Sequence, residues 1–384
     1  MGSFTFKKWN TILGWFVFLI ALLTYWSTVE PTASFWDAGE YITTASNLEV
    51  GHPPGAPLYQ LMGAFFSIFA MDATNIALTI NLMSVFASAF TILFMFWSVT
   101  ILLSNLVKKN DTFTKNNQIA ILGSAVIGSL TFAFTDSFWY SAVEAEVYAM
   151  AAFIMSVLFY AGLRWEGEMF TPRGDKWVVL IAFVIGLSFG VHFMGLLTIP
   201  AIGFLYFFKN YTKVTVKNFL IANVVTVAIL LFIFKLLLPM TLRFFSAAEI
   251  FFVNQINMPF NSGTIIAGLL FLAVFYFGLR YTRRKSFVKI NTLLLCVLFI
   301  FIGFSSWLML PIRANAGTVI NENNPNNARE LLAYYNREQY PETHLFYGPL
   351  FTEAYVGLDK DNPFLDDKPK YEKDLEAKKY VIVN

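Results

Sequence analysis

The sequence predicts an all-α integral membrane protein, built as a polytopic helical bundle. Hydrophobic residues make up 57% of the 384 positions and charged residues only 14%, which is far from the composition of a soluble domain. Apolar runs long enough to cross a hydrocarbon core of about 30 Å recur along the chain. The net charge is only +2, and the basic residues lie in short clusters between these runs rather than on one face. A nucleic-acid partner is therefore not expected.

Nine apolar segments are expected to span the membrane, each bounded by polar or charged residues. They lie at about 9–28, 75–105, 118–135, 147–163, 177–192, 194–208, 218–240, 263–280 and 289–310. The run 177–208 is divided near His192 because it is too long for one crossing, although a single tilted helix is the alternative. This scheme gives a membrane domain at 1–310 and a short extracytoplasmic C-terminal segment at 311–384.

The basic clusters predict the orientation of the bundle. Lys and Arg fall in every second connection, around residues 7–8, 108–115, 164–176, 209–217 and 280–289. Such clusters mark cytoplasmic loops, whereas the connections 29–74 and 136–146 contain no Lys or Arg. We therefore expect the N-terminus to be cytoplasmic and the loop 29–74 to face outward. A cleavable signal peptide is the alternative for the first run, but that run lacks a small-residue cleavage pattern.

The outer loop 29–74 is expected to form two interfacial helices around the turn "GHPPG" at 51–55. Ser34 can cap the first helix, with Asp37 three residues later and Glu40 on the same face. The stretch 57–70 would reach only about 21 Å as a helix, too short for a crossing. The two prolines stiffen the turn, so His52 is expected to converge with the carboxylates above the membrane.

Three further polar features follow along the chain. In "DSFWYSAVEAEVYAM", Glu144 and Glu146 would lie about 200° apart on a regular helix, so one of them should serve a site. We favour Glu144 and leave Glu146 open. His192 lies between two apolar segments, where it either contacts a substrate or caps a helix end. Arg313 leaves the last predicted span, where its guanidinium could bind a phosphate or anchor to anionic headgroups.

Several of these motifs carry a resemblance to known families. "FWDAGEY" followed by "GHPPGAPLY" resembles the first outer loop of GT-C-type glycosyltransferases. Together with "FWYSAVEAEVYA", "GVHFMGL" and "LPIRANAGTVINENNPNNARELLAYYNREQY", the sequence more closely resembles a family of multi-spanning bacterial membrane proteins, long known as a domain of unknown function. The animal relatives of that family are protein O-mannosyltransferases of the endoplasmic reticulum. The resemblance reaches to about Tyr340, and family members commonly continue beyond the length of this chain, so its C-terminal segment is expected to be truncated.

The resemblance implies a GT-C-like fold and a glycosyltransferase of the bacterial inner membrane. Such an enzyme moves a mannose-like sugar from a polyprenyl-phosphate donor to a Ser or Thr hydroxyl of an exported protein, on the outer side. Asp37 matches the first acidic position of these enzymes and is the expected general base. The expected substrate-binding residues are Glu40, His52, Glu144, His192 and Arg313. No cofactor is expected, and no metal, because the acids show no diagnostic metal-binding spacing.

Structural alternatives for these residues stay open at the level of sequence. Asp37 could only support a helix end, Glu40 could be a solvated acid, and His52 could only lock the turn. For the whole protein, the main competitor is a secondary transporter or a flippase of lipid-linked sugars. Transporters usually place polar groups at the membrane midplane in paired broken helices, whereas the acids here gather in outward connections. A structural subunit of an export machine would leave these acids unexplained.

Overall fold

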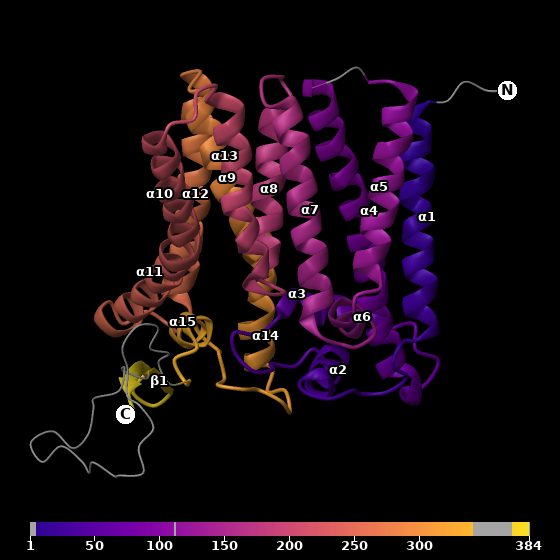
Figure 1. Ribbon diagram of the computed structural model, residues 1–384. Helices are drawn as coiled ribbons and strands as arrows, with labels where there is room; N and C mark the ends of the chain where they lie inside the picture. The colour runs from indigo at the N-terminus through magenta and orange to yellow at the C-terminus, as the bar shows by residue number, and fades with distance from the viewer. Residues whose placement is uncertain (1–4, 111–112, 341–370, 384) are drawn as a thin grey trace, which may run out of the picture.

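The computed structural model describes residues 5–110, 113–340 and 371–383. Figure 1 shows long helices standing side by side, with short helices gathered at the lower end of the bundle. The long helices are α1 (Phe6–Ser27), α4 (Ile76–Asn110), α5 (Lys115–Ala133), α7 (Val147–Glu168), α8 (Gly174–Ser188), α9 (Thr198–Asn210), α10 (Val216–Leu231), α11 (Leu238–Ile250), α12 (Ser262–Arg284) and α13 (Val288–Phe304). Many large apolar side chains on their outer surfaces are exposed, as expected for helices that face lipid. The prediction of an all-α polytopic membrane protein is confirmed.

Fewer helices than the nine predicted spans meet the length and apolarity of a membrane crossing in the described residues. In the described part of the chain, seven helical stretches are long and apolar enough to span a membrane, or up to eight if α5 and α6 (Asp136–Ala142), bent by 69°, count as one span. Helix α8 corresponds to the predicted segment 177–192, but its 15 residues rise only about 22 Å. Nine crossings therefore stays a prediction.

The short helices include the pair that was expected in the outer loop. Helix α2 (Ala38–Asn47) and helix α3 (Pro57–Ser67) flank the turn at 51–55. The prediction of two short helices around this turn is confirmed. The expected cap is wrong. Ser34 lies outside the helix and donates to Glu144 Oε2 at 2.7 Å, while Asp37 occupies the N-cap position of α2.

The C-terminal part folds back onto this end of the bundle. After α13 the chain forms α14 (Met309–Asn315) and α15 (Ala328–Asn336), and an antiparallel hairpin pairs β1 (Tyr371–Asp374) with β2 (Lys379–Ile382). Backbone hydrogen bonds from Val50 N–H to Ile320 O (3.1 Å) and from Glu322 N–H to Val50 O (3.0 Å) join the outer loop to the segment before α15. The C-terminal segment thus forms part of the surface around the turn.

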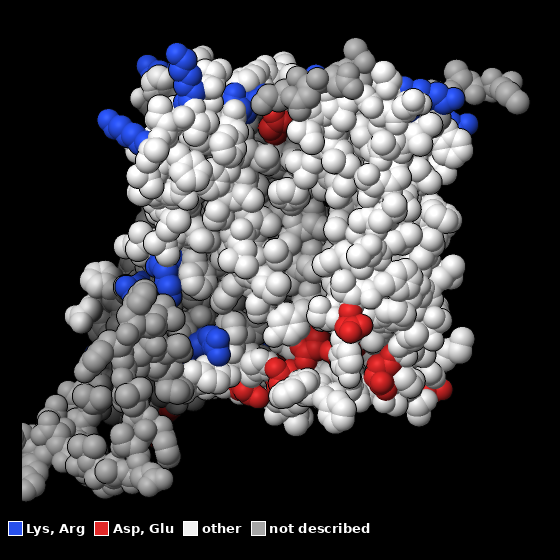
Figure 2. Space-filling model, in the orientation of Figure 1, with Lys and Arg blue, Asp and Glu red and all other residues white. Residues whose placement is uncertain are grey.

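Charged side chains separate along the bundle. Figure 2 shows Lys and Arg mainly along the upper edge, and Asp and Glu mainly along the lower edge where α2 and α6 lie. The loops at the upper edge include those that were expected to be cytoplasmic. The separation matches the pattern from which the orientation was predicted, and the assignment of each end to a side of the membrane stays a prediction.

Close packing fixes α15 and the helices behind the turn. A Cβ on Gly186 of α8 would collide with the Ile300 carbonyl of α13, so the two helices approach at backbone distance. The Trp307 indole N–H donates to Phe189 O at 2.9 Å, and its ring lies 5.3 Å from that of Tyr335. These buried aromatic contacts hold α15 against the end of α8, beside the turn.

Candidate functional site

A cavity of about 490 Å³ lies at this end of the bundle, and we call it the outer-loop cavity. It is formed by α2, the turn, the connection before α7, the end of α8 and the residues that follow α15. Its lining residues are Asp37, Glu40, Tyr41, His52, Pro53, Pro54, Gly55, Glu146, Val147, Tyr148, Phe189, Val191, His192, Phe193, Arg337 and Tyr340. Four residues that were singled out from the sequence as site candidates, Asp37, Glu40, His52 and His192, therefore meet here.

Asp37 presents its carboxylate to this cavity. It occupies the N-cap position of α2, but its side chain makes no capping hydrogen bond and is 58% exposed. The Oδ2 atom lies 3.9 Å from His52 Nε2. Because the carboxylate does not cap the helix, the capping alternative does not account for its position.

Glu40 and His52 form a tight pair beside Asp37. Glu40 Oε1 accepts from the His52 backbone N–H at 2.7 Å, and His52 Nδ1 lies 3.1 Å from both carboxylate oxygens. This side-chain hydrogen bond raises the pKa of His52 against the opposing effect of burial, with further help from the charges of Glu40, Asp37 and Glu322. Burial raises the pKa of Glu40, but the bonds from His52 and its charge outweigh burial and leave that pKa lowered. The pair therefore favours an imidazolium whose Nε2 faces Asp37.

The two acids before α7 lie differently from the prediction. The chain at Glu146 is extended, with φ −122° and ψ 151°, so the regular-helix argument does not apply there. Glu146 lines the cavity and is 6% exposed, whereas Glu144 is bonded to Ser34 and is not among the lining residues. Burial, then the charges of Asp37 and Glu144, raise the pKa of Glu146 to about 7, against the lowering effect of the Asp37 and Val147 backbone N–H groups. The preference for Glu144 as the cavity acid is thus corrected to Glu146.

His192 both caps a helix and lines the cavity. Its Nδ1 accepts from the Met194 backbone N–H at 3.2 Å, at the start of the short helix Phe193–Leu197. Burial lowers the pKa of His192, and its ring lies 5.5 Å from that of Tyr148. With Nδ1 accepting, the proton of the neutral ring sits on Nε2. The capping alternative describes its local contacts, and the ring still faces the cavity.

Arg313 lies away from the cavity lining. Its Nε donates to Leu48 O at 2.5 Å and its Nη2 donates to Asn47 O at 3.2 Å. These carbonyls end α2, and a guanidinium is favourable at the negative end of a helix. The structure therefore gives Arg313 a bonding role at the C-terminus of α2, which was not foreseen.

Arg337 and Tyr340 line the cavity but were not singled out at the level of sequence. Arg337 ends α15 with a left-handed φ of 56°, and its guanidinium lies 4.5 Å from the centre of the Tyr340 ring. Both follow α15 in "NREQY", within the last motif of the resemblance. No local signal distinguishes this Arg from an ordinary helix-end cation, because its place depends on how α15 folds back onto the turn.

The acids and the imidazole could also hold a cation. One ligand atom each from Asp37, Glu40 and His52 lies within 4.8 Å of the others. Carboxylate oxygens and an imidazole nitrogen are suitable ligands for several divalent ions. Glu40 and His52 are already bonded to each other, and the expectation of no metal stays a prediction.

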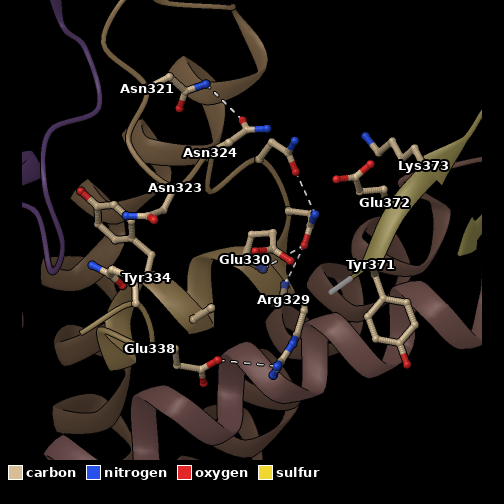
Figure 3. Close-up of a pocket in the computed structure, with 14 residues that line it drawn as sticks. Asn321, Asn323, Asn324, Arg329, Glu330, Tyr334, Glu338, Tyr371, Glu372 and Lys373 are labelled. Atoms are coloured by element: carbon tan, nitrogen blue, oxygen red, sulfur yellow. Dashed lines mark hydrogen bonds and ion pairs between the residues drawn. The ribbon is translucent and has the colours of Figure 1, made fainter. Parts of the chain in front are cut away.

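A second polar pocket of about 660 Å³ is lined by residues of α15, the segment before it and β1 (Figure 3). Its amides largely bond to one another: Asn321 Nδ2 donates to Asn324 Oδ1 at 3.1 Å, and Asn327 Nδ2 donates to Asn326 Oδ1 at 2.8 Å. Asn327 also caps α15. We therefore interpret this pocket as the polar framework that positions α15.

Comparisons with known proteins give a consistent picture. Residues 37–215 match the family model described as the protein O-mannosyl-transferase TMEM260 N-terminal domain. The chain is 24% identical over 206 residues to protein O-mannosyl-transferase tmem260 of Dictyostelium discoideum, a match that covers 50% of this chain and 23% of that protein. It is 26% identical over 172 residues to protein O-mannosyl-transferase TMEM260 of Mus musculus, covering 45% of this chain and 22% of that protein.

The matched region bears directly on the cavity. It begins at Asp37 and includes Glu40, His52, Glu146 and His192, whereas the residues after α15 lie outside it. The matches span less than a quarter of the length of the two curated relatives, and no solved structure matches the chain. Over residues 37–215 the chain is thus similar to the N-terminal domain of a protein O-mannosyl-transferase.

Proposed function

We propose that this chain is a GT-C-type glycosyltransferase that moves a mannose-like sugar from a polyprenyl-phosphate donor to a Ser or Thr hydroxyl of a protein. The observation that carries the proposal is the exposed Asp37 carboxylate, held beside the Glu40–His52 pair in a cavity at one end of a membrane bundle. The names of the relatives support protein mannosyl transfer. The donor and the acceptor class are inferences from the site and the resemblance.

The proposed reaction is a single displacement at the anomeric carbon. The acceptor hydroxyl oxygen forms a bond to this carbon while the bond from the carbon to the phosphate oxygen breaks, and the phosphate leaves with the electron pair. Asp37 takes the hydroxyl proton as attack proceeds, a contribution of roughly 10²–10⁴-fold. This carboxylate is suited to the step because its oxygens are not engaged in capping α2.

The groups around Asp37 prepare it for that role. His52 Nε2 lies 3.9 Å from Asp37 Oδ2, which places a ring nitrogen beside the carboxylate. Glu40 fixes the ring of His52 through Nδ1, so that Nε2 faces Asp37. Glu146 is partly protonated near neutral pH and can donate a hydrogen bond to a sugar or acceptor oxygen.

The reaction is proposed to occur on the outer side of the membrane, with the N-terminus cytoplasmic. The separation of charges in Figure 2 supports this orientation, since the cavity lies at the acidic end. A bacterial inner membrane follows from the sequence resemblance alone, because the two relatives compared are eukaryotic. An apolar cavity of about 860 Å³ between α11, α12, α13 and α15 offers space for the lipid chain of the donor.

Membranes that contain the protein, supplied with polyprenyl-phosphate sugars and peptides rich in Ser and Thr, test the proposal. We expect sugar-modified peptides by mass spectrometry, with the modification mapped to Ser or Thr. Vesicles containing the purified protein should show no movement of lipid-linked sugar between leaflets. Leaflet exchange without peptide modification would support the flippase instead and would remove the transferase proposal.

A further inference from the structure

We propose that Arg337, rather than Arg313, is the cation that binds the donor phosphate in the outer-loop cavity. The inference rests on the proposed function, because it assumes that the ligand carries a prenyl phosphate. It deepens that function by naming the anion-binding residue. Its support comes from the placement of cations around the cavity, from the contacts of both arginines and from the anchoring of α15.

The cavity needs a cation to accept a phosphate. Three acidic residues line it, Asp37, Glu40 and Glu146, and carboxylate charge at close range opposes an anionic ligand. Among the described lining residues, Arg337 is the one Lys or Arg side chain. The imidazole of His52 lines the cavity as well, but its Nδ1 faces Glu40 and its Nε2 faces Asp37. Arg337 is therefore the lining cation whose N–H groups can donate to a ligand.

The two arginines differ in what they already bind. Arg313 donates to two backbone carbonyls at the end of α2, so moving it to a phosphate would break both bonds. Within the described part of the chain, Arg337 forms no ion pair, and its guanidinium stacks over the Tyr340 ring. A stacked guanidinium keeps its in-plane N–H donors available, and these match two phosphate oxygens.

The position of Arg337 is fixed by the helix that carries it. Tyr334 O–H donates to Gly51 O at 2.5 Å, which ties α15 to the turn of the outer loop. Tyr335 O–H donates to Phe234 O at 2.8 Å, which ties α15 to the membrane helices. Arg337 N–H donates to Tyr334 O at 3.1 Å and closes the helix. The guanidinium thus extends from an anchored helix end rather than from a long free loop.

This placement gives Arg337 a defined part in the proposed reaction. As the bond between the anomeric carbon and the phosphate oxygen breaks, a full negative charge passes to the phosphate. A guanidinium bonded to the other phosphate oxygens stabilises that charge. Lys would keep the positive charge but lose the paired donors, so it should substitute only partly.

Ligand-dependent thermal stability of the purified full chain tests the phosphate contact directly. Farnesyl phosphate is the probe, and farnesol, which has the same chain without the phosphate, is its control. In the wild type we expect a larger rise in Tm with farnesyl phosphate than with farnesol. Arg337→Gln should abolish this difference. Arg283→Gln removes an exposed cation in the last turn of α12, outside the cavity lining, and should keep the difference. An unchanged difference in Arg337→Gln would overturn the proposal.

Transfer kinetics separate phosphate binding from a merely structural role. Arg337→Gln should raise the donor KM by about 10-fold or more and leave the acceptor KM unchanged, with Arg337→Lys between it and the wild type. If Arg337 had only a structural role, Arg337→Gln would lower the Tm without ligand but keep the phosphate-dependent rise. That result would count against the proposal. If the wild type transfers no sugar but the phosphate-dependent rise is lost in Arg337→Gln, the proposed function fails while the anion site stands.

Discussion

The buried carboxyl of Glu146 gives a prediction whose size follows from the structure. Its pKa rises from the usual 4.5 to about 7, because burial and the charges of Asp37 and Glu144 disfavour the ionised form. The folded protein therefore holds this proton more tightly than the unfolded chain does. The resulting stability is fully present below about pH 4.5 and is lost as the pH rises through about 7. At about 1.4 kcal/mol per pKa unit, the loss amounts to about 3 kcal/mol.

Glu146→Gln removes the ionisation and keeps the shape of the side chain. We expect the variant to be more stable than the wild type at pH 8, by up to about 3 kcal/mol, and close to it at pH 5. Thermal unfolding in detergent at several pH values between 5 and 8.5 measures the difference. Asp136→Asn, at an exposed carboxylate of α6, is the matched control. Its stability should not rise above that of the wild type as the pH increases. A Glu146→Gln variant that parallels the wild type at every pH would refute the account of a buried, neutralised carboxyl.

Three further substitutions test the framework around the cavity. Tyr334→Phe leaves the buried Gly51 carbonyl without its side-chain donor and should lower the free energy of unfolding by about 1–3 kcal/mol; an unchanged Tm would show that this bond does not hold α15. Gly186→Ala should lower the free energy of unfolding by about 1–3 kcal/mol, because the added methyl group pushes α8 away from α13. Gly128→Ala, with open space around it, should be neutral in the same thermal unfolding measurement. Equal effects of the two substitutions would contradict the close approach of α8 and α13. Arg313→Ala should lower the Tm equally with and without farnesyl phosphate, and a selective loss of the phosphate effect would return the phosphate contact to Arg313.

Local patterns predicted much of the outer loop. The Pro-Pro turn and the apolar stretch after it determine where α2 ends and α3 begins, so Asp37, Glu40 and His52 could be expected to converge from the sequence. These three residues are close in sequence and lie on one helix and one stiff turn, so local patterns are enough to place them together.

The structure departs from the expected placements where a residue's position depends on distant parts of the chain. The choice of Glu144 assumed a regular helix, but the chain is extended at Glu146 and turns its side chain inward. Arg313 was expected in the site because it follows a span, yet its partners, the carbonyls at the end of α2, lie about 265 positions earlier in the sequence. Arg337 reaches the cavity only because α15 folds back onto the turn. Such long-range contacts leave no periodicity for a single sequence to reveal.

The proposed role of Asp37 as general base is tested by measuring sugar transfer and thermal stability side by side in Asp37→Asn. The amide keeps the size of the side chain but cannot take the acceptor proton. We predict that transfer falls by roughly 10²-fold or more, while the Tm stays near that of the wild type because the carboxylate makes no capping bond. An Asp37→Asn variant with full transfer activity, at normal abundance in the membrane, would contradict the claim.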